Sequence, residues 1–395
     1  MAKLKEVCTF FADGDWIESS DQSDEGIRLI QTGNIGEGKY LEKETRAKYI
    51  SESTFNKLSC TEVYPGDILV SRLPEPVGRA CIIPEKNERM ITAVDCTICR
   101  PNETLISKEY MCYFMRSNVY HTRLLGSVTG TTRKRISRKN LGNVEVKIPP
   151  KGEQNAIVKQ LDCLTSVISL RSRELELLDE LVRGRFVEMF GDPYINEFGW
   201  KKIKIKNAVT VEPQNGMYKP QSDYVTDGSG IPILRIDGFY DGIVTDFSSL
   251  KRLKCSENER KKYLLYEDDV VINRVNSIEY LGKCAHINGL LEDTVYESNM
   301  MRMHFDSTRF HPVYVCRLLC SRFVYDQIVN HAKQAVNQAS INQKDVLDFE
   351  IYEPPLKLQT KFSDFVYQVN KSKFRGFSML TTMKSAYEQQ TLIYP

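Results

Sequence analysis

The sequence predicts an α+β protein: two similar mixed α/β domains separated by two long helices that form an antiparallel coiled coil. Three observations lead to this prediction. The chain has 395 residues, which is long for a single hydrophobic core. It repeats itself at an offset of about 204 positions, and each repeat ends in a stretch with heptad spacing of apolar residues. Each repeat is therefore expected to contain a globular part followed by a long helix.

The repeat rests on four segments of the first half that match four segments of the second half in the same order. These pairs are 27–34 with 231–238, 64–72 with 266–274, 78–80 with 282–284, and 136–154 with 341–359. The offsets lie between 202 and 205 residues. Such a period is too long for a solenoid, so it indicates a duplicated domain.

Each globular part is rich in short β-like runs, such as residues 67–70, 81–83 and 144–148, which Gly and Pro residues interrupt. Helical stretches are expected at residues 110–125 and 312–332. Both globular parts end at a Pro-Pro pair, which stops a strand and opens a helix.

The first long helix follows the first Pro-Pro pair. Steps of four and three residues connect ten positions, of which eight are apolar, and this spacing is typical of a coiled-coil seam. These positions are Ile157, Leu161, Leu164, Ile168, Arg171, Leu175, Leu178, Val182, Arg185 and Met189. A helix over this span would be about 50 Å long, at 1.5 Å per residue.

The second long helix follows the second Pro-Pro pair with the same spacing. Its seam positions are Phe362, Val366, Val369, Lys373, Gly376, Leu380, Met383 and Tyr387. Lys373 and Gly376 argue against an uninterrupted helix here. Two helices with one apolar seam each are expected to pack on one another; the alternative is that each helix covers only its own domain.

Residues 190–200 are rich in Gly, Pro and Asn, as expected of a helix end and a linker. The predicted boundaries are therefore a first domain at 1–150, a central helix at 151–190, a linker at 191–200, a second domain at 201–355 and a C-terminal helix at 356–393. Within the linker, Gly191-Asp192-Pro193-Tyr194 faintly resembles the Asp-Pro-Pro-Tyr motif of amino-methyltransferases. It lacks the second proline, so we interpret it as a turn.

Composition and charge narrow the class of protein. No run of about 18 apolar residues is present, so a membrane span is not expected. The N-terminus has no apolar signal segment, and the eleven cysteines are expected to be reduced in a cytoplasmic protein. The net charge is only +2, yet residues 131–139 hold five cations in nine residues. Positive charge is thus partly segregated, as nucleic-acid binding requires.

Enzyme and metal motifs do not stand out. The sequence has no phosphate-binding loop of the Gly-x4-Gly-Lys-Ser/Thr type and no glycine-rich dinucleotide turn. Cys96 and Cys99 form a single Cys-x-x-Cys, and a structural zinc site normally needs four ligands. Alternation along residues 93–100 favours core cysteines in a strand, with Cys96 and Ile98 on one face; metal binding or redox chemistry is the alternative. We therefore predict neither catalysis nor a metal site.

The alternation of two globular domains with two long helices resembles the specificity (S) subunit of type I restriction-modification systems. Residues 130–136, Gly-Thr-Thr-Arg-Lys-Arg-Ile, followed by residues 146–154, are similar to the end of that family's first domain. Residues 190–193, Phe-Gly-Asp-Pro, followed by Gly199-Trp200, are similar to its linker. The second domain departs from the pattern, with Asn337-Gln338-Ala339-Ser340-Ile341 in place of the basic run and Leu358-Gln359 in place of Glu-Gln.

This resemblance implies that each globular part is a target recognition domain that reads one half of a split site in double-stranded DNA. It implies that the helices set the distance between the half-sites and dock two methyltransferase subunits, which restriction subunits then join. The implied cofactors are S-adenosylmethionine, ATP and Mg²⁺, and they belong to those partners and not to this chain. The competing hypothesis is a coiled-coil scaffold whose domains bind proteins rather than DNA.

Reading DNA requires amide and guanidinium groups at base edges and cations at phosphates. Such residues follow predicted strands in both domains. The candidates are Gln31, Asn34, Arg72, Thr131, Thr132, Arg133, Lys134 and Arg135 in the first, and Arg235, Asn273, Arg274, Asn276, Gln334, Asn337, Gln338, Ser340 and Asn342 in the second. The alternatives are that the basic run is a solvated loop and that the amides cap turns.

Overall fold

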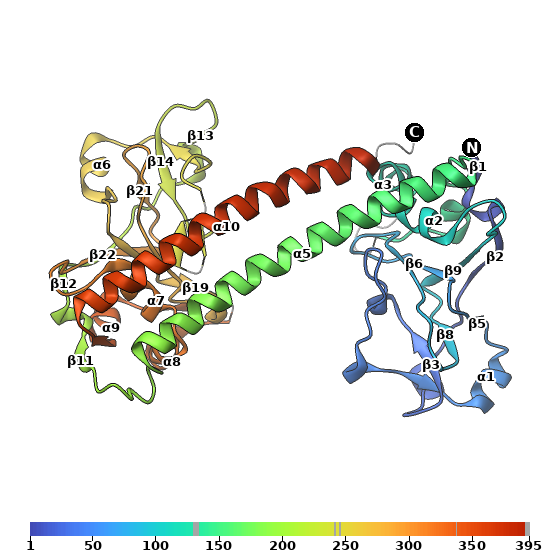
Figure 1. The fold of residues 1–395 in the computed structure, drawn as a ribbon, viewed down its shortest axis with the longest axis horizontal. Helices are drawn as coiled ribbons and strands as arrows, with labels where there is room; N and C mark the ends of the chain where they lie inside the picture. Colours follow the sequence, from blue (N-terminus) through green and yellow to red (C-terminus); the bar gives the residue numbers. More distant parts are fainter. Residues whose placement is uncertain (129–133, 241, 245, 337, 392–395) are drawn as a thin grey trace. The chain divides into compact units, whose positions relative to one another are not determined.

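The computed structural model describes residues 1–128, 134–240, 242–244, 246–336 and 338–391. By its internal contacts the chain divides into two compact units. Unit 1 is Met1–Glu174 together with the chain from Gly376 onward, and unit 2 is Leu175–Arg375. Each unit therefore contains one globular part and a half of each long helix (Figure 1).

Unit 1 contains two four-stranded sheets. The first, in the order β2-β9-β6-β7, is antiparallel throughout and is made of β2 (Cys8–Asp13), β9 (Cys96–Pro101), β6 (Ile68–Ser71) and β7 (Ala80–Ile82). The second, in the order β4-β3-β8-β5, is made of β4 (Tyr49–Ile50), β3 (Ile27–Ile30), β8 (Met90–Thr92) and β5 (Glu62–Val63), with β3 and β8 parallel. The alternation predicted for β9 is confirmed: Cys96 and Ile98 pack in one hydrophobic cluster, and Cys99 packs in another.

Short elements complete the globular part of unit 1. Strand β1 (Ala2–Lys3) pairs with β10 (Glu145–Val146). The helices are α1 (Glu52–Leu58), α2 (Lys108–Phe114), α3 (Asn118–Leu125) and α4 (Arg138–Gly142). A serine side chain caps the N-terminus of each of these helices, which satisfies an otherwise unpaired backbone amide.

Unit 2 repeats in its first sheet the strand order of the counterpart sheet in unit 1 with one extension, and its second sheet shares three strands with its counterpart. Its first sheet is β12 (Val209–Asn215), β22 (Met300–Phe305), β18 (Val270–Asn273) and β20 (Cys284–His286), continued by β16 (Gly242–Val244) and β15 (Phe239–Tyr240). Its second sheet is β13 (Tyr224–Val225), β17 (Arg252–Leu253), β14 (Ile231–Leu234) and β21 (Val295–Tyr296). Strands β14 and β21 are parallel, as are β3 and β8 in unit 1.

Further short strands and helices complete the globular part of unit 2. Strand β11 (Lys201–Lys204) pairs with β25 (Glu350–Glu353), and β19 (Val275–Asn276), β24 (Ala339–Ser340) and β23 (Lys333–Gln334) form a three-stranded sheet. The helices are α6 (Glu257–Tyr263), α7 (Pro312–Leu319), α8 (Arg322–His331) and α9 (Gln343–Asp348).

The two units share details as well as topology. Gly78 and Gly282 occupy equivalent turns with φ of +88° and +77°, a region that favours glycine. A Cβ at Gly78 would lie 2.2 Å from the Leu124 side chain, and a Cβ at Gly282 would lie 2.1 Å from the Ile328 side chain. The same backbone geometry and the same close helix approach thus recur at an offset of 204, as the repeat predicts.

The long helices are α5 (Lys151–Phe190) and α10 (Leu356–Thr391), and both are continuous (Figure 1). Within unit 2, Val182 from the last turns of α5 lies in one hydrophobic cluster with Phe362, Val366 and Val369 from the first turns of α10. Lys373 is half-buried, and its Nζ lies 2.5 Å from Oδ1 of Asp179 on α5. The polar seam residue that argued against a continuous helix is therefore paired across the helices.

Within unit 1 the opposite ends of the helices meet. Leu161 is buried, and Ile157 and Tyr387 pack against the same cluster. Because the start of α5 meets the end of α10 here, and the end of α5 meets the start of α10 in unit 2, the helices run antiparallel. The antiparallel helix pair was predicted, and this is its confirmation within each unit.

Seam positions along both helices are buried or half-buried, with one difference at the end of α5. The positions in question are Leu164, Ile168, Leu175, Leu178, Leu380 and Met383 in addition to those above. Near the C-terminus of α5, Phe186 and Phe190 are the fully packed residues, whereas the predicted Arg185 and Met189 are only half-buried. Both phenylalanines pack against Phe362 with ring centroids 5.5 Å apart. A strict heptad fails here because this part of α5 also covers the globular core of unit 2.

Candidate nucleic-acid interface

Three loops of unit 1 are tied together by Arg72, which directly follows β6, and Arg79, which directly precedes β7. The first loop comprises residues 31–35, the second residues 72–79 and the third residues 134–136. Arg79 joins the first two: its Nε donates to the carbonyl of Ile35 at 2.7 Å, its Nη2 to Thr32 at 2.8 Å, and its Nη1 to Leu73 at 2.9 Å. Repeat matching alone did not identify Arg79 as a linking residue.

Arg72 joins the second loop to the third. Its carbonyl accepts a hydrogen bond from the Ile136 amide at 3.2 Å, and its Nη2 donates to the carbonyl of Val94 at 2.5 Å. Arg72 is only 5% exposed and lies 3.3 Å from Oδ2 of Asp13. Burial lowers the pKa of its guanidinium group. A cation this enclosed is placed to hold the loops and not to reach a base.

The third loop carries solvent-accessible positive charge. Lys134 is exposed, and Arg135, also exposed, pairs with Oδ1 of Asp95 at 2.8 Å. Asp95 in turn accepts the Arg72 amide through its backbone carbonyl at 2.9 Å. Arg72, Lys134 and Arg135, all predicted from sequence, therefore lie together around one turn. The predicted Thr131, Thr132 and Arg133, and Asn337 of unit 2, lie outside the described residues.

Gln31 and Asn34 belong to the first loop but face different environments. The Asn34 amide is buried: its Nδ2 donates to the Leu41 carbonyl at 2.9 Å and its Oδ1 accepts the Gln31 amide at 3.0 Å. Asn34 therefore shapes the turn, which was the alternative considered for the amides. The Gln31 side chain is partly exposed.

Unit 2 repeats the linkage around Arg274, the counterpart of Arg72. Its amide donates to the Asn299 carbonyl at 2.8 Å, its Nη1 donates to Ser298 at 3.0 Å, and its carbonyl accepts the Ile341 amide at 3.0 Å. Arg72 makes the equivalent three bonds, to Asp95, Val94 and Ile136. These partners precede those of Arg274 by 204 or 205 residues, as the repeat predicts. Loops of quite different sequence are thus fixed to their domain by the same three contacts.

The third loop of unit 2 is an exposed β-hairpin. Strands β23 and β24 pair through Lys333 with Ser340 and Gln334 with Ala339, and β24 pairs with β19 at Asn276. Gln334 and Gln338 are exposed, and Val336 near the tip is 99% exposed. Among its described residues, the hairpin presents the amides of Gln334 and Gln338 and the apolar side chain of Val336 to solvent. Ser340 and Asn276 lie on its base strands and are partly exposed.

The other predicted residues of unit 2 are used within the domain. Asn273 is fully buried and its Oδ1 accepts the Val275 amide at 3.2 Å. Asn342 caps α9 by accepting the amides of Lys344 and Asp345. Arg235 is partly buried, and its Nη1 donates to the Tyr224 hydroxyl at 3.2 Å.

Lys283 occupies in unit 2 the position of Arg79. Its Nζ lies 3.5 Å from the carbonyl of Ile236, in the loop that follows β14 as the first loop of unit 1 follows β3. It also lies 3.3 Å from the centre of the Tyr240 ring. Burial lowers the pKa of Lys283. Tyr240 and Tyr280, on either side of it, are about half exposed. Sequence patterns gave no signal for this pair of aromatic rings, because their proximity depends on the extra strands β15 and β16.

One glutamine in each unit fixes the start of a long helix to its domain. Gln154 on α5 is fully buried: its Oε1 accepts the Ser107 amide at 2.9 Å, and its Nε2 donates to the carbonyls of Leu105 and Pro149, both at 2.9 Å. Gln359 on α10 makes the same three bonds to the His311 amide and to Arg309 and Pro354, at 2.8–2.9 Å. In the sequence, Gln154 and Gln359 matched only as the last residues of the repeated segments 136–154 and 341–359.

The long helices also carry exposed apolar side chains away from the seam. In unit 1 these are Leu170, Phe377 and Met379, and in unit 2 they are Leu177, Leu181, Val187, Tyr367 and Phe374. Phe374 is 78% exposed. Large exposed side chains of this kind on a helix are typical of protein interfaces. Among the residues with described positions, no helix is long and apolar enough to cross a membrane.

The segment that faintly resembles a methyltransferase motif is a turn, as we interpreted it. Gly191 has φ of +79°, and Oδ1 of Asp192 accepts the Tyr194 amide at 2.8 Å. The carbonyl of Pro193 accepts a hydrogen bond from the Tyr352 hydroxyl at 2.9 Å.

Comparisons with known proteins identify the relatives of this architecture. Residues 1–180 match the family described as type I restriction modification DNA specificity domain. The chain is 24% identical over 363 residues to the EcoKI specificity subunit of Escherichia coli, covering 88% of this chain and 76% of the relative. It is 23% identical over 364 residues to the StySPI specificity subunit of Salmonella potsdam, with the same coverage.

Two solved structures share the fold along almost the whole chain. One structure concerns the complex assembly and conformational transition of a type I restriction-modification system. It aligns with a TM-score of 0.58 at 17% identity, covering 99% of this chain and 95% of that one. The other is the S subunit from M. genitalium, with a TM-score of 0.57 at 12% identity, covering 100% and 95%. At such low identity these likenesses support the arrangement of the fold, and the sequence relatives support the family.

Proposed function

The chain belongs to the specificity subunits of type I restriction-modification systems, and from this premise we propose that each of its two units reads one half of a split site in double-stranded DNA. It is a recognition subunit and does not itself catalyse methylation or cleavage. Its partners are DNA and the other subunits of the restriction-modification complex.

One observation carries the proposal of a split site: the three-loop arrangement occurs twice. Arg72 and Arg274 make equivalent hydrogen bonds to the turn beside them and to the loop that ends the domain. A device that reads two separate half-sites needs two complete readers with independent contact surfaces. The shared framework and the different loops meet that requirement, since framework holds position and loops carry sequence preference.

Within each reader the residues divide by exposure. Lys134 and Arg135, exposed on the third loop of unit 1, are proposed to contact phosphates. Gln334 and Gln338, on the hairpin of unit 2, have the bidentate amides that suit adenine in the major groove. The buried Arg72, Arg274, Asn34 and Asn273 are positioning residues in this proposal. The exposed Tyr240 and Tyr280 are added as candidates for contact with DNA.

We propose that the exposed apolar side chains of α5 and α10 dock two methyltransferase subunits, to which restriction subunits then bind. The cofactors S-adenosylmethionine, ATP and Mg²⁺ belong to those subunits. Phe374→Glu should reduce co-purification with the methyltransferase subunits, because a charge would replace a 78%-exposed aromatic contact. Lys371→Glu, also an exposed position on α10, is the matched control. Equal recovery of the complex for both variants would contradict docking at Phe374.

The decisive test of the function is methylome sequencing of the source cell with and without this gene. Loss of one split methylation motif, with all other motifs retained, is the expected result. An unchanged methylome in a cell that expresses the subunits would contradict the assignment. The alternative function, a scaffold whose domains bind proteins, predicts no change in any methylation motif, and the relatives do not favour it.

A further inference from the structure

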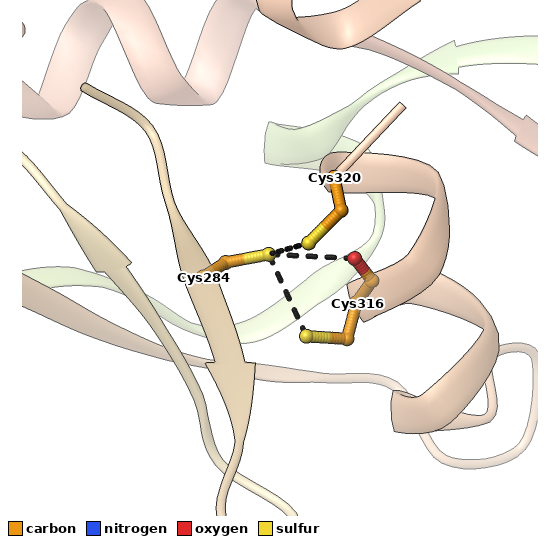
Figure 2. Close-up of side chains that lie close together, drawn as sticks. All are labelled: Cys284, Cys316 and Cys320. Carbon is orange, nitrogen blue, oxygen red and sulfur yellow. Dashed lines mark hydrogen bonds between the residues drawn. The ribbon is translucent and has the colours of Figure 1, made fainter. Parts of the chain in front are cut away.

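Three cysteine side chains from two elements of unit 2 converge on one point (Figure 2). Cys284 lies on β20, Cys316 lies on α7, and Cys320 follows at the end of that helix. The Sγ of Cys284 is 3.5 Å from that of Cys316 and 3.3 Å from that of Cys320. Because Cys316 and Cys320 are four residues apart, their side chains share the helix face that packs on β20.

We propose that Cys284, Cys316 and Cys320 form a binding site for one thiophilic metal ion, Zn²⁺ or Cu⁺, coordinated by three thiolates. All three sulfur atoms lie within 4.8 Å of one another. Metal–sulfur bonds of about 2.3 Å at tetrahedral or trigonal angles place sulfur atoms about 3.8–4.0 Å apart. The two distances from the Cys284 sulfur therefore need to widen by only about 0.3–0.7 Å for the cluster to coordinate an ion. Soft thiolate ligands select these ions over Mg²⁺ or Ca²⁺.

The internal repeat argues that packing alone does not require this cluster. At the repeat offset of 204, Ala80 takes the place of Cys284, Cys112 that of Cys316, and Arg116 that of Cys320. Ala80 is fully buried on β7, which pairs with β6 as β20 pairs with β18. The same strand–helix contact is thus built in unit 1 with a single sulfur atom. Unit 2 places three cysteine sulfur atoms at this contact, although unit 1 builds the same contact with one.

Access to the cluster agrees with an exchangeable ion. Cys284 and Cys316 are buried, whereas Cys320 is exposed, so one ligand faces solvent and leaves an entry path. A water molecule entering from that side would complete a tetrahedral zinc site. Binding of the ion by three thiolates releases the thiol protons to solvent.

The site shares no residue with the proposed DNA contacts, and its effect would be on the stability of unit 2. An ion held by β20 and α7 joins the central sheet to the helix that covers it. Since the ion binds the folded state, it stabilises that state in proportion to its occupancy. Loss of the site should lower thermal stability without altering which DNA site is read.

The test uses the full chain, purified anaerobically with reductant, and three single variants. Cys284→Ala and Cys320→Ala each remove one proposed ligand. The fold is expected to accommodate alanine at position 284, because Ala80 is its counterpart in unit 1. Cys163→Ala, at an exposed cysteine on α5, is the matched control. Metal analysis measures bound zinc and copper, and Cd²⁺ titration followed by thiolate-to-metal absorption reports the number of sulfur ligands.

The wild type and Cys163→Ala are expected to bind one Cd²⁺ per chain with absorption typical of three thiolates, and to melt at a higher temperature with the ion. Both cluster variants should lose this equivalent while remaining folded by circular dichroism. No Cd²⁺ binding by the wild type, or full binding by Cys284→Ala, would overturn the proposal. So would a Cys284–Cys320 disulfide found by mass spectrometry in the anaerobically reduced protein, because that pair could not then ligate.

Discussion

Unit 1 and unit 2 share a framework but differ in the loops that it holds. The two arginines that anchor the loops make the same contacts to backbone carbonyls, and the two glutamines at the helix starts make the same three bonds. By contrast, the third loop is basic in unit 1 and an amide-bearing hairpin in unit 2. Unit 2 also adds β15 and β16 to its sheet. The comparison teaches that the duplicated part holds the loops in position, and in our proposal the divergent part determines the choice of DNA sequence.

Exchange of one globular part should have the largest effect. Replacing residues 201–350 by the equivalent segment of another specificity subunit should change one half of the methylated motif and leave the other half intact. Each mismatched base pair costs about 1–3 kcal/mol, so several together should shift preference by more than about a thousandfold. Methylation-motif sequencing measures this. A change in both halves, or in neither, would show that the units do not read independently.

The framework itself is tested by its buried glutamines. Gln154→Leu and Gln359→Leu each leave two carbonyls and one amide buried without partners, at about 1–3 kcal/mol each. We expect each variant to lose about 3 kcal/mol or more of unfolding free energy, measured by urea denaturation. The two losses should be similar if the units are equivalent. Gln160→Leu and Gln368→Leu, at exposed positions of the same helices, are the controls and should have little effect.

The hairpin of unit 2 sharpens the comparison at the level of single bases. Gln334→Ala and Gln338→Ala should each weaken binding by about 1–3 kcal/mol if the amide pairs with adenine. The loss of preference should fall in one half-site only, because unit 1 is unchanged. Competition binding with DNA mutated one position at a time measures this. Loss spread evenly over both half-sites would mean that these amides contribute to stability and not to recognition.

Much of the architecture was predictable because it depends on patterns within short stretches. The repeat predicted two similar domains, and the 4-3 spacing predicted buried or half-buried positions along α10, including Leu380 and Tyr387. The end of α5 was predicted less well. Phe186 and Phe190 lie one position beyond the seam residues Arg185 and Met189, and their burial depends on the globular core of unit 2 as well as on Phe362.

Candidate DNA contacts were less predictable than the fold, for a physical reason. Asparagine and arginine after a strand are equally suited to a base and to a backbone carbonyl, and only the tertiary structure decides. Asn34, Asn273 and Arg72 proved to be buried and bonded within the domain, whereas Gln334, Gln338 and Lys134 are exposed. Similarly, the four-residue spacing of Cys316 and Cys320 places them on one helix face, but Cys284 joins them only through the packing of β20 on α7.

The smallest expected effect concerns the two described cations of the third loop in unit 1. Lys134→Ala and Arg135→Ala together should weaken binding to every DNA sequence alike and reduce the salt dependence by up to about two units of slope. The reason is counterion release, which contributes about 0.9 of slope per phosphate contact. Lys134 should account for most of the change, because Arg135 already pairs with Asp95 at 2.8 Å and must give up or share that partner.

Lys5→Ala and Lys147→Ala, at exposed lysines of the same unit, provide the baseline. Titrations of the purified complex at several salt concentrations measure the slope. If the double variant and the baseline variants have the same slope, the third loop is ordinary solvated surface, and unit 1 must hold DNA through other residues than its basic run.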